Sequence, residues 1–368
     1  EKEMKELGLT EVVLDDKCYL YGKLPATEGK KEIPALGFIA HMDTVSDFCD
    51  HEIRPIVTEN YDGGDLVLGT SGLVLSPKEF PHLTGLKGRT LLTSDGTTIL
   101  GADDKAGIAE ILTMIERIQT ENRPHGTICV AFTPDEEIGM GAEHFNLDQF
   151  GAEYAYTLDG DSEGEIQYEN FNACKAEFEI RGFNVHPGEG KDTMINASLV
   201  AIEINNCLPS METPRGTEDY EGFYHLISMQ GEVGEAKLNY IVRDHDKNGF
   251  EERKKTLRLI EKNLNAKWGE GTVTLKITDQ YLNMKEIVEE HMHLIDHAKK
   301  ACEAAGVAPL ILPIRGGTDG CQLSFKGLPC PNLGTGGHAF HGPYEHISVE
   351  GMEKSVELLL ALIQEYTK

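Results

Sequence analysis

Residues 128–137 read ICVAFTPDEE, an apolar run that ends on Asp135, Glu136 and Glu137. Residues 36–43 (LGFIAHMD) and 154–161 (YAYTLDGD) repeat this pattern and end on histidine or aspartate. Short apolar runs separated by helical patterns are typical of a mostly parallel sheet with helices on both of its faces. The sequence therefore predicts an α/β fold whose strands each end on polar, ionisable side chains.

Helical spacing supports this fold on either side of the quoted runs. Residues 106–124 carry apolar side chains at the spacing of one helix face and end on a proline, namely Ile108, Ile111, Leu112, Ile115, Ile118 and Pro124. The last 20 residues predict an amphipathic helix with an apolar face of Val349, Met352, Val356, Leu359 and Ile363. Both helices are expected to cover the sheet.

The hydrophobic pattern changes at about residue 172 from continuous apolar runs to alternation. KAEFEIR alternates apolar and charged side chains as a half-exposed antiparallel strand does. A helix, two strands, a charged helix and a last strand follow, which is the β-α-β-β-α-β order of a ferredoxin-like domain. We therefore predict a discontinuous α/β/α domain (1–171 and 285–368). A smaller lid or dimerisation domain (172–284) interrupts it, and it could join two copies of the chain as a homodimer.

Composition excludes several classes of protein. The 368 residues contain 34 Lys and Arg against 62 Asp and Glu, a net charge of −28 that repels nucleic acid. No apolar run approaches the roughly 18 residues of a membrane-spanning helix. Eight scattered cysteines, without a CxxC pair, indicate reduced thiols and a cytoplasmic location. The opening EKEMKELGLTEV reads like the end of a helix, so we expect further chain upstream.

Acidic and imidazole side chains are expected to converge at one edge of the sheet. The ligand crevice of an open α/β sheet lies beyond the carboxyl ends of its strands, where His41, Glu137 and Asp159 follow the apolar runs. LGADDKAG adds Asp103 and Asp104 at the start of a helix. So many carboxylates repel one another unless cations bind among them. Histidine with carboxylates, and no cysteine, suits zinc, cobalt or manganese.

Each of these residues also has an ordinary structural explanation. A single acidic residue after a strand is usually a loop residue or a helix cap, and a single histidine is usually structural. The metal-site interpretation rests on four such placements occurring together.

The motifs HMDT, LGADDKAG, FTPDEEIG, TLDGD, NVHPG, PIRGGTDG, LSFKGLPCPN and HGPYEH occur in this order. With them the sequence resembles the tripeptide aminopeptidase (peptidase T) family. That family lies within the superfamily of co-catalytic zinc peptidases, which includes carboxypeptidase G and the aminoacylases. The resemblance runs from about Leu36 to the C-terminus.

The resemblance implies that residues 1–171 and 285–368 form the catalytic, metal-binding domain, and it implies a role for each matching residue. Asp103 would bridge two Zn²⁺ ions, with His41 and Asp159 completing one site and Glu137 and His341 the other. Asp43 would orient His41, and Glu136 would act as the general base toward a water bound to the two zinc ions. The Asp103-Asp104 peptide bond would be cis. In the inserted domain, His186 would polarise the substrate carbonyl and Arg243 would bind the peptide carboxylate, for which Arg315 is a weaker candidate.

The expected activity is removal of the N-terminal residue from tripeptides. A dipeptidase, a carboxypeptidase or an aminoacylase of the same superfamily is the alternative activity. A metal-binding module without catalysis is the alternative from another class. A module without activity has no need for Glu136 beside the ligand Glu137, and this sequence keeps both.

Overall fold

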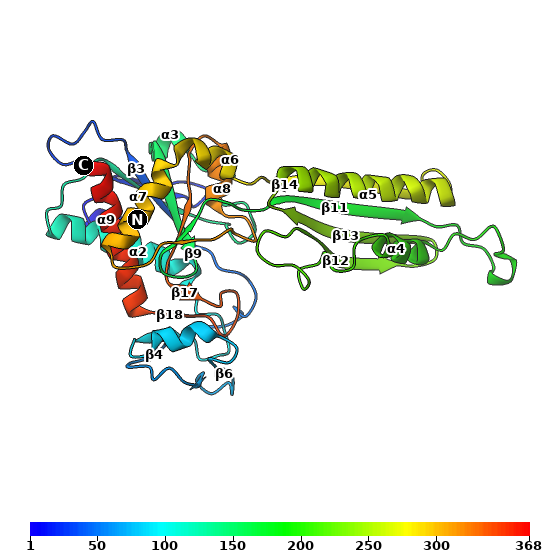
Figure 1. The fold of residues 1–368 in the computed structure, drawn as a ribbon, viewed down its shortest axis with the longest axis horizontal. Helices are drawn as coiled ribbons and strands as arrows, with labels where there is room; N and C mark the ends of the chain where they lie inside the picture. The colour runs from blue at the N-terminus through cyan, green and yellow to red at the C-terminus, as the bar shows by residue number, and fades with distance from the viewer. The chain divides into compact units, whose positions relative to one another are not determined.

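The computed structural model describes residues 1–368, which divide into two compact units (Figure 1). Unit 1 comprises residues 1–168, 284–312 and 318–368, and unit 2 comprises residues 169–283 with 313–317. No helix combines the length and the apolar character that a membrane span requires.

Unit 1 is built on an eight-stranded sheet in the order β1-β2-β8-β3-β9-β16-β10-β15. Its strands are β1 (Thr10–Leu14), β2 (Leu20–Leu24), β3 (Leu36–His41), β8 (Ile128–Thr133), β9 (Tyr154–Gly160), β10 (Glu165–Gln167), β15 (Leu310–Ile311) and β16 (Asn332–Gly334). The central strands β8, β3, β9 and β16 are parallel, whereas β2 pairs antiparallel with β8. The three predicted apolar runs are therefore three adjacent parallel strands.

Helices cover both faces of this sheet, as the sequence predicted. They are α1 (Lys2–Glu6), α2 (Ala102–Thr120), α3 (Leu147–Phe150), α6 (Lys285–Val288), α7 (His293–Ala304), α8 (Asp319–Phe325) and α9 (Val349–Thr367), with 3-10 turns η1 (Pro81–Leu86) and η3 (Glu289–His291). Cys129 and Ala131 of β8 face a core that contains Leu323 of α8. The opposite face packs against α2 and α7, and α9 packs on both of these helices (Figure 1).

Two further small sheets of unit 1 are formed by strands of two or three residues. One has the order β17-β18-β7-β4, from β4 (Ile56–Thr58), β7 (Leu91–Thr93), β17 (Gly337–His338) and β18 (His346–Ser348). The other pairs β5 (Leu66–Val67) with β6 (Val74–Leu75). The loop between β17 and β18 carries His341, so the first of these sheets supports a predicted site residue.

Unit 2 is a four-stranded antiparallel sheet in the order β12-β13-β11-β14. Its elements are β11 (Asn172–Arg181), η2 (Pro187–Glu189), α4 (Ala197–Asn206), β12 (Phe223–Gly231), β13 (Glu235–Asp244), α5 (Lys247–Trp268) and β14 (Val273–Tyr281). Alternate side chains of β11, such as Phe178 and Ile180, are buried in one core with α4 and α5. Apart from the short η2, this is the β-α-β-β-α-β order that the sequence predicted.

Candidate active site

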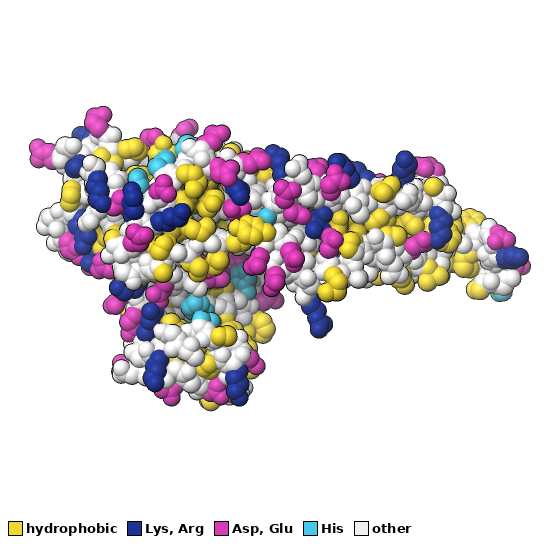
Figure 2. Space-filling view, in the orientation of Figure 1, with side chains coloured by type: hydrophobic (Ala, Val, Ile, Leu, Met, Phe, Trp, Pro, Cys, Tyr) yellow, Lys and Arg dark blue, Asp and Glu magenta, His cyan; other side chains and the backbone are white.

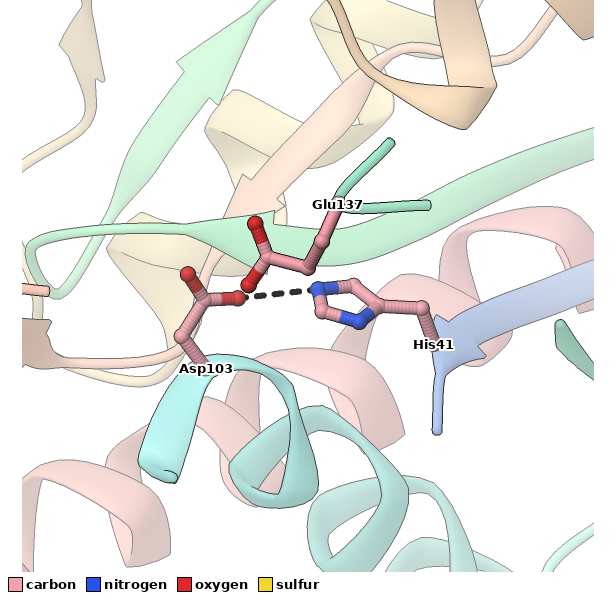
Figure 3. Close-up of side chains that lie close together, drawn as sticks. All are labelled: His41, Asp103 and Glu137. Atoms are coloured by element: carbon pink, nitrogen blue, oxygen red, sulfur yellow. Dashed lines mark hydrogen bonds and ion pairs between the residues drawn. The ribbon is translucent and has the colours of Figure 1, made fainter. Parts of the chain in front are cut away.

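The predicted side chains of unit 1 meet at the carboxyl ends of β8, β3 and β9. His41 is the last residue of β3, Asp159 lies near the end of β9, and Glu137 follows β8 by four residues. Asp103 comes from the first turn of α2, opposite these strand ends (Figure 3). Two groups of three residues each bring one possible ligand atom per residue to within 4.8 Å of one another. The first group is His41, Asp103 and Glu137, and the second is His41, Glu136 and Asp159.

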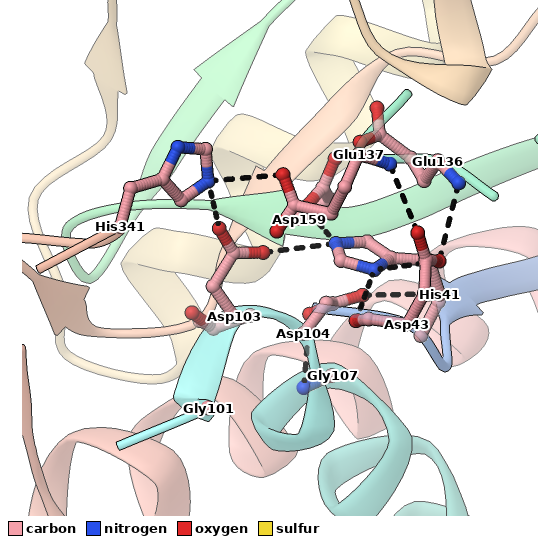
Figure 4. Close-up of polar contacts among 12 residues, drawn as sticks. His41, Asp43, Gly101, Asp103, Asp104, Gly107, Glu136, Glu137, Asp159 and His341 are labelled. Atoms are coloured by element: carbon pink, nitrogen blue, oxygen red, sulfur yellow. Dashed lines mark hydrogen bonds and ion pairs between the residues drawn. The ribbon is translucent and has the colours of Figure 1, made fainter. Parts of the chain in front are cut away.

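Asp103 divides its two oxygens between two imidazoles (Figure 4). Its Oδ1 lies 2.9 Å from Nε2 of His41, and its Oδ2 lies 2.9 Å from Nε2 of His341. Each imidazole nitrogen has a second carboxylate close by: Asp159 Oδ1 is 3.3 Å from His41 Nε2, and Glu137 Oε2 is 3.1 Å from His341 Nε2. The arrangement consists of two similar donor sets that share Asp103.

The electrostatics of this cluster favour bound cations. Burial alone would lower the pKa of His41, but hydrogen bonds to Asp103, Asp159 and Asp43 raise it far above its ordinary value. Hydrogen bonds to Asp103 and Glu137 raise the pKa of His341 to about 10. Oε1 of Glu137 is buried without a hydrogen-bond partner. Imidazoles and carboxylates at this spacing suit a divalent d-block cation, which would replace the protons now shared between them.

Asp43 connects the imidazole to the two adjacent glutamates. Its Oδ1 accepts a hydrogen bond from the backbone N–H of Glu136, and its Oδ2 accepts one from that of Glu137, both at 3.1 Å. Nδ1 of His41 lies 3.0 Å from the carbonyl oxygen of Asp43 and 3.5 Å from its Oδ1. Asp43 thus faces the imidazole and also fixes the turn that carries both glutamates.

Glu136 differs from its neighbour in its surroundings. Its carboxylate accepts no hydrogen bond from the chain, whereas that of Glu137 lies against His341. Burial, followed by the negative charges of Asp159 and Asp319, raises the pKa of Glu136 well above that of an ordinary glutamate. A carboxylate with a raised pKa beside a cation-binding cluster can accept and release protons near neutral pH.

The start of α2 is held in place by buried groups. The Asp103-Asp104 peptide bond is cis, as the resemblance implied. Asp104 is buried, and its Oδ2 accepts a hydrogen bond from the backbone N–H of His41 at 3.0 Å. A Cβ at Gly107 would lie 2.3 Å from the carbonyl oxygen of Leu158, so only glycine lets α2 approach β9 this closely. These contacts set the position of Asp103 relative to His41.

Two buried carboxyl groups that support the site received no role from the sequence. Glu345 accepts hydrogen bonds from the backbone N–H groups of Leu100, Gly101 and Asp103. Asp319 accepts one at 2.7 Å from Oγ1 of Thr133, at the end of β8, and burial raises its pKa to about 7. Asp319 stands in the PIRGGTDG motif and Glu345 in HGPYEH, but the motifs alone give no indication of these partners.

The three predicted substrate-binding residues lie in unit 2. His186 is exposed, and its Nδ1 accepts a hydrogen bond from the N–H of Gly188 at 3.2 Å, so in the neutral ring Nε2 carries the proton. Arg243 is buried over the ring of Tyr281, donates to the carbonyl oxygens of Cys174 and Val242, and forms no ion pair. The guanidinium of Arg315 donates to carbonyl oxygens of the 217–221 loop, which leaves it fewer donors for a substrate.

Fold and site together define a class of enzyme: a hydrolase with a mixed α/β fold that places acidic and imidazole side chains at the carboxyl ends of parallel strands. The model of Peptidase family M20/M25/M40 matches residues 96–365, and the chain belongs to this family. It is therefore a peptidase, an enzyme that hydrolyses peptide bonds.

Individual relatives agree with this assignment. Peptidase T of Caldanaerobacter subterraneus is 52% identical over 100% of this chain and 90% of its own length. The crystal structure of aminopeptidase PepT from Bacillus cereus superposes with a TM-score of 0.80 at 26% identity, over 100% of this chain and 91% of that one. A tripeptidase from Staphylococcus aureus has the same fold, with a TM-score of 0.80 at 22% identity, over 99% and 90% of the two chains.

Proposed function

We propose that this chain is an aminopeptidase that releases the N-terminal residue of tripeptides with two zinc ions as cofactors. The observation that carries the proposal is the shared carboxylate of Asp103, which lies 2.9 Å from each of two imidazoles. The 52% identity to a peptidase T and the likeness to an aminopeptidase and a tripeptidase support this substrate class.

The residues present fit two cations. Asp103, His41 and Asp159 would hold one, and Asp103, Glu137 and His341 the other. The unpartnered Oε1 of Glu137 supports this assignment, because a buried carboxylate oxygen normally has a partner. When bound, the cations would acidify a water molecule and polarise the scissile carbonyl.

Glu136 would be the general base. Its raised pKa and its lack of hydrogen bonds from the chain suit a group that takes a proton from the attacking water and then delivers it to the leaving amine. Asp43 fixes the backbone of Glu136 through a hydrogen bond from its N–H, and it leaves the carboxylate of Glu136 without a hydrogen bond. Two adjacent glutamates would then have different roles, one moving protons and one holding a cation.

Residues of unit 2 would bind the scissile carbonyl and the C-terminal carboxylate of the substrate. Nε2–H of His186 would donate to the carbonyl oxygen as negative charge develops there, a contribution of about 3 to 4 kcal/mol for a well-placed donor. Arg243 is a buried cation without a carboxylate partner, so a peptide carboxylate would complete its ion pair.

Glu136→Gln tests the proposal directly. The variant should keep the metal content of the wild type and lose turnover of tripeptides by about a hundredfold or more. Glu143→Gln, an exposed change in the same loop region, is the matched control and should keep full activity. Near-normal turnover in folded, metal-loaded Glu136→Gln would remove Glu136 from the mechanism.

A substrate panel separates the alternatives. Tripeptides should be hydrolysed, and a chelator should abolish the reaction. Dipeptides, N-acyl amino acids and peptides blocked at the amino end should react poorly. Faster hydrolysis of any of these than of tripeptides would reassign the enzyme within its superfamily.

We also propose that unit 2 pairs with a second copy in a homodimer and that the protein works in a reducing cytoplasm. Ile227 and Met229 on the edge strand β12 are 58% and 39% exposed, which supports pairing at this edge. All eight cysteines are free thiols, which supports the reducing compartment. Light scattering of the wild type and of Ile227→Lys tests the pairing, and a monomeric wild type would exclude it.

A further inference from the structure

A second group of histidines lies in unit 1, outside the candidate active site. Residues 291–297 read HMHLIDH, with His291 at the end of η3 and His293 and His297 in the first turns of α7. Residues four apart in a helix lie on the same face, so His293 and His297 are neighbours. Figure 2 shows histidine side chains gathered on the surface over α7. The ring centres of His293 and His297 are 5.8 Å apart.

Two tyrosines flank the pair. Tyr154, the first residue of β9, lies with its ring centre 4.7 Å from that of His293, and Tyr366 of α9 lies 4.7 Å from that of His297. All three histidines are half-buried. The imidazoles are therefore held by packing from two other elements and still reach the surface, so a small ion could enter.

No nitrogen of these three rings is hydrogen-bonded to the rest of the chain, and Nδ1 of His297 is buried without a partner. A buried ring nitrogen normally has a hydrogen-bond partner. Burial lowers the pKa of both His293 and His297, so both rings are neutral at pH 7 and each offers a lone pair. Neutral imidazole is the form that binds a metal.

The spacing of the rings suits a shared cation. With Zn–N bonds of about 2.0 to 2.1 Å and a tetrahedral angle, two imidazoles on one ion have ring centres roughly 5 Å apart. The observed 5.8 Å is within a small side-chain rotation of that value. Glu153 makes the local potential at His293 more negative, and Glu365 does so at His297, where Lys300 opposes it.

We propose that His293 and His297 bind one divalent d-block cation, such as Ni²⁺, Cu²⁺ or Zn²⁺, at a site separate from the candidate active site. His291 lies beside it, with its ring centre 6.1 Å from that of His293. Tyr154 and Asp159 are separated along β9 by a strand rise of about 17 Å, so the two sites lie toward opposite ends of this strand. Occupancy of one site therefore does not require occupancy of the other.

Equilibrium dialysis against Ni²⁺ at pH 7.5, with bound metal counted by mass spectrometry, tests the proposal. Wild type that carries only two equivalents of zinc, with all further zinc removed by desalting, should bind one Ni²⁺ that His297→Asn and His293→Asn bind about a hundredfold more weakly, because one ligand of a chelating pair is lost. His144→Asn, which removes a single exposed histidine of unit 1, is the matched control and should bind Ni²⁺ like the wild type. Both helix variants should keep full tripeptide turnover.

Asp103→Ala separates this proposal from the proposed function. It should abolish hydrolysis and leave the Ni²⁺ equivalent of His293 and His297 in place. The proposal is overturned if Asp103→Ala loses all of the Ni²⁺ binding that the wild type shows. It is also overturned if His293→Asn and His297→Asn bind Ni²⁺ as tightly as the wild type. The histidines would then be packing residues only.

Discussion

Asp43→Asn should impair the enzyme although Asp43 is not one of the proposed metal ligands. In the wild type each carboxylate oxygen accepts one backbone N–H, from Glu136 and Glu137, at 3.1 Å. The asparagine oxygen can accept only one of these, and its NH₂ group faces the other N–H. The variant therefore loses one charge-assisted hydrogen bond, which is worth about 1.5 to 3 kcal/mol.

That loss should appear in catalysis, because the two glutamates are displaced together. Groups that orient metal ligands typically contribute about 10- to 100-fold in activity or metal affinity, which corresponds to about 1.4 to 2.7 kcal/mol. The effect should therefore be smaller than that of Glu136→Gln.

The assay is kcat on a tripeptide in excess metal, with metal content and melting temperature measured on the same samples. Asp47→Asn, an exposed change on the same loop, is the control and should match the wild type. Wild-type turnover and metal content in Asp43→Asn would refute the reasoning, because they would mean that the turn holds its position without this carboxylate.

Three further outcomes are expected. Arg243→Ala should raise KM for free tripeptides and leave it nearly unchanged for C-terminally amidated ones; equal losses on both would make Arg243 structural. His186→Ala should lower kcat by about a hundredfold or more with metal content unchanged, and a lower melting temperature with intact kcat would instead identify a turn residue. Burial lowers the pKa of His346 to about 4. As the pH falls, the imidazole is therefore protonated in the unfolded chain before it is protonated in the folded one, and stability that is present above pH 6.5 is lost as the pH falls toward 4. Between pH 7.5 and pH 5, His346→Phe should therefore lose about 2 kcal/mol less unfolding free energy than the wild type, as measured by urea titration, and equal losses would contradict this.

The sequence predicted those parts of the molecule whose position follows from the pattern of apolar and polar residues along a strand or a helix. Apolar runs that end on His41, Glu137 and Asp159 define parallel strands, and parallel strands bring their carboxyl ends together, so convergence followed from the order of residues. The alternation around Phe178 likewise predicted an antiparallel strand, which is β11. The family resemblance added the division of Asp103 between His41 and His341.

Other features depend on tertiary contacts that no local pattern encodes. The sheet that supports His341 is made of strands too short to show a period, such as Gly337–His338. Asp319 and Thr133 meet across 186 residues of chain, and the sequence indicates neither partner to the other. The donors of Arg315 proved to be engaged with the 217–221 loop, which the motif around it could not reveal.

The close approach at Gly107 has a consequence for how this enzyme can change. Asp103 is carried by α2 and Asp159 by β9, and the two elements meet where a Cβ would lie 2.3 Å from the carbonyl oxygen of Leu158. A single added methyl group would push the helix away from the strand and separate the two carboxylates. The distance between the two proposed ligands is thus set by the absence of a side chain at Gly107, which is not itself a proposed ligand. Every other amino acid has a Cβ, so even a conservative substitution of Gly107 would be selected against as long as hydrolysis is required.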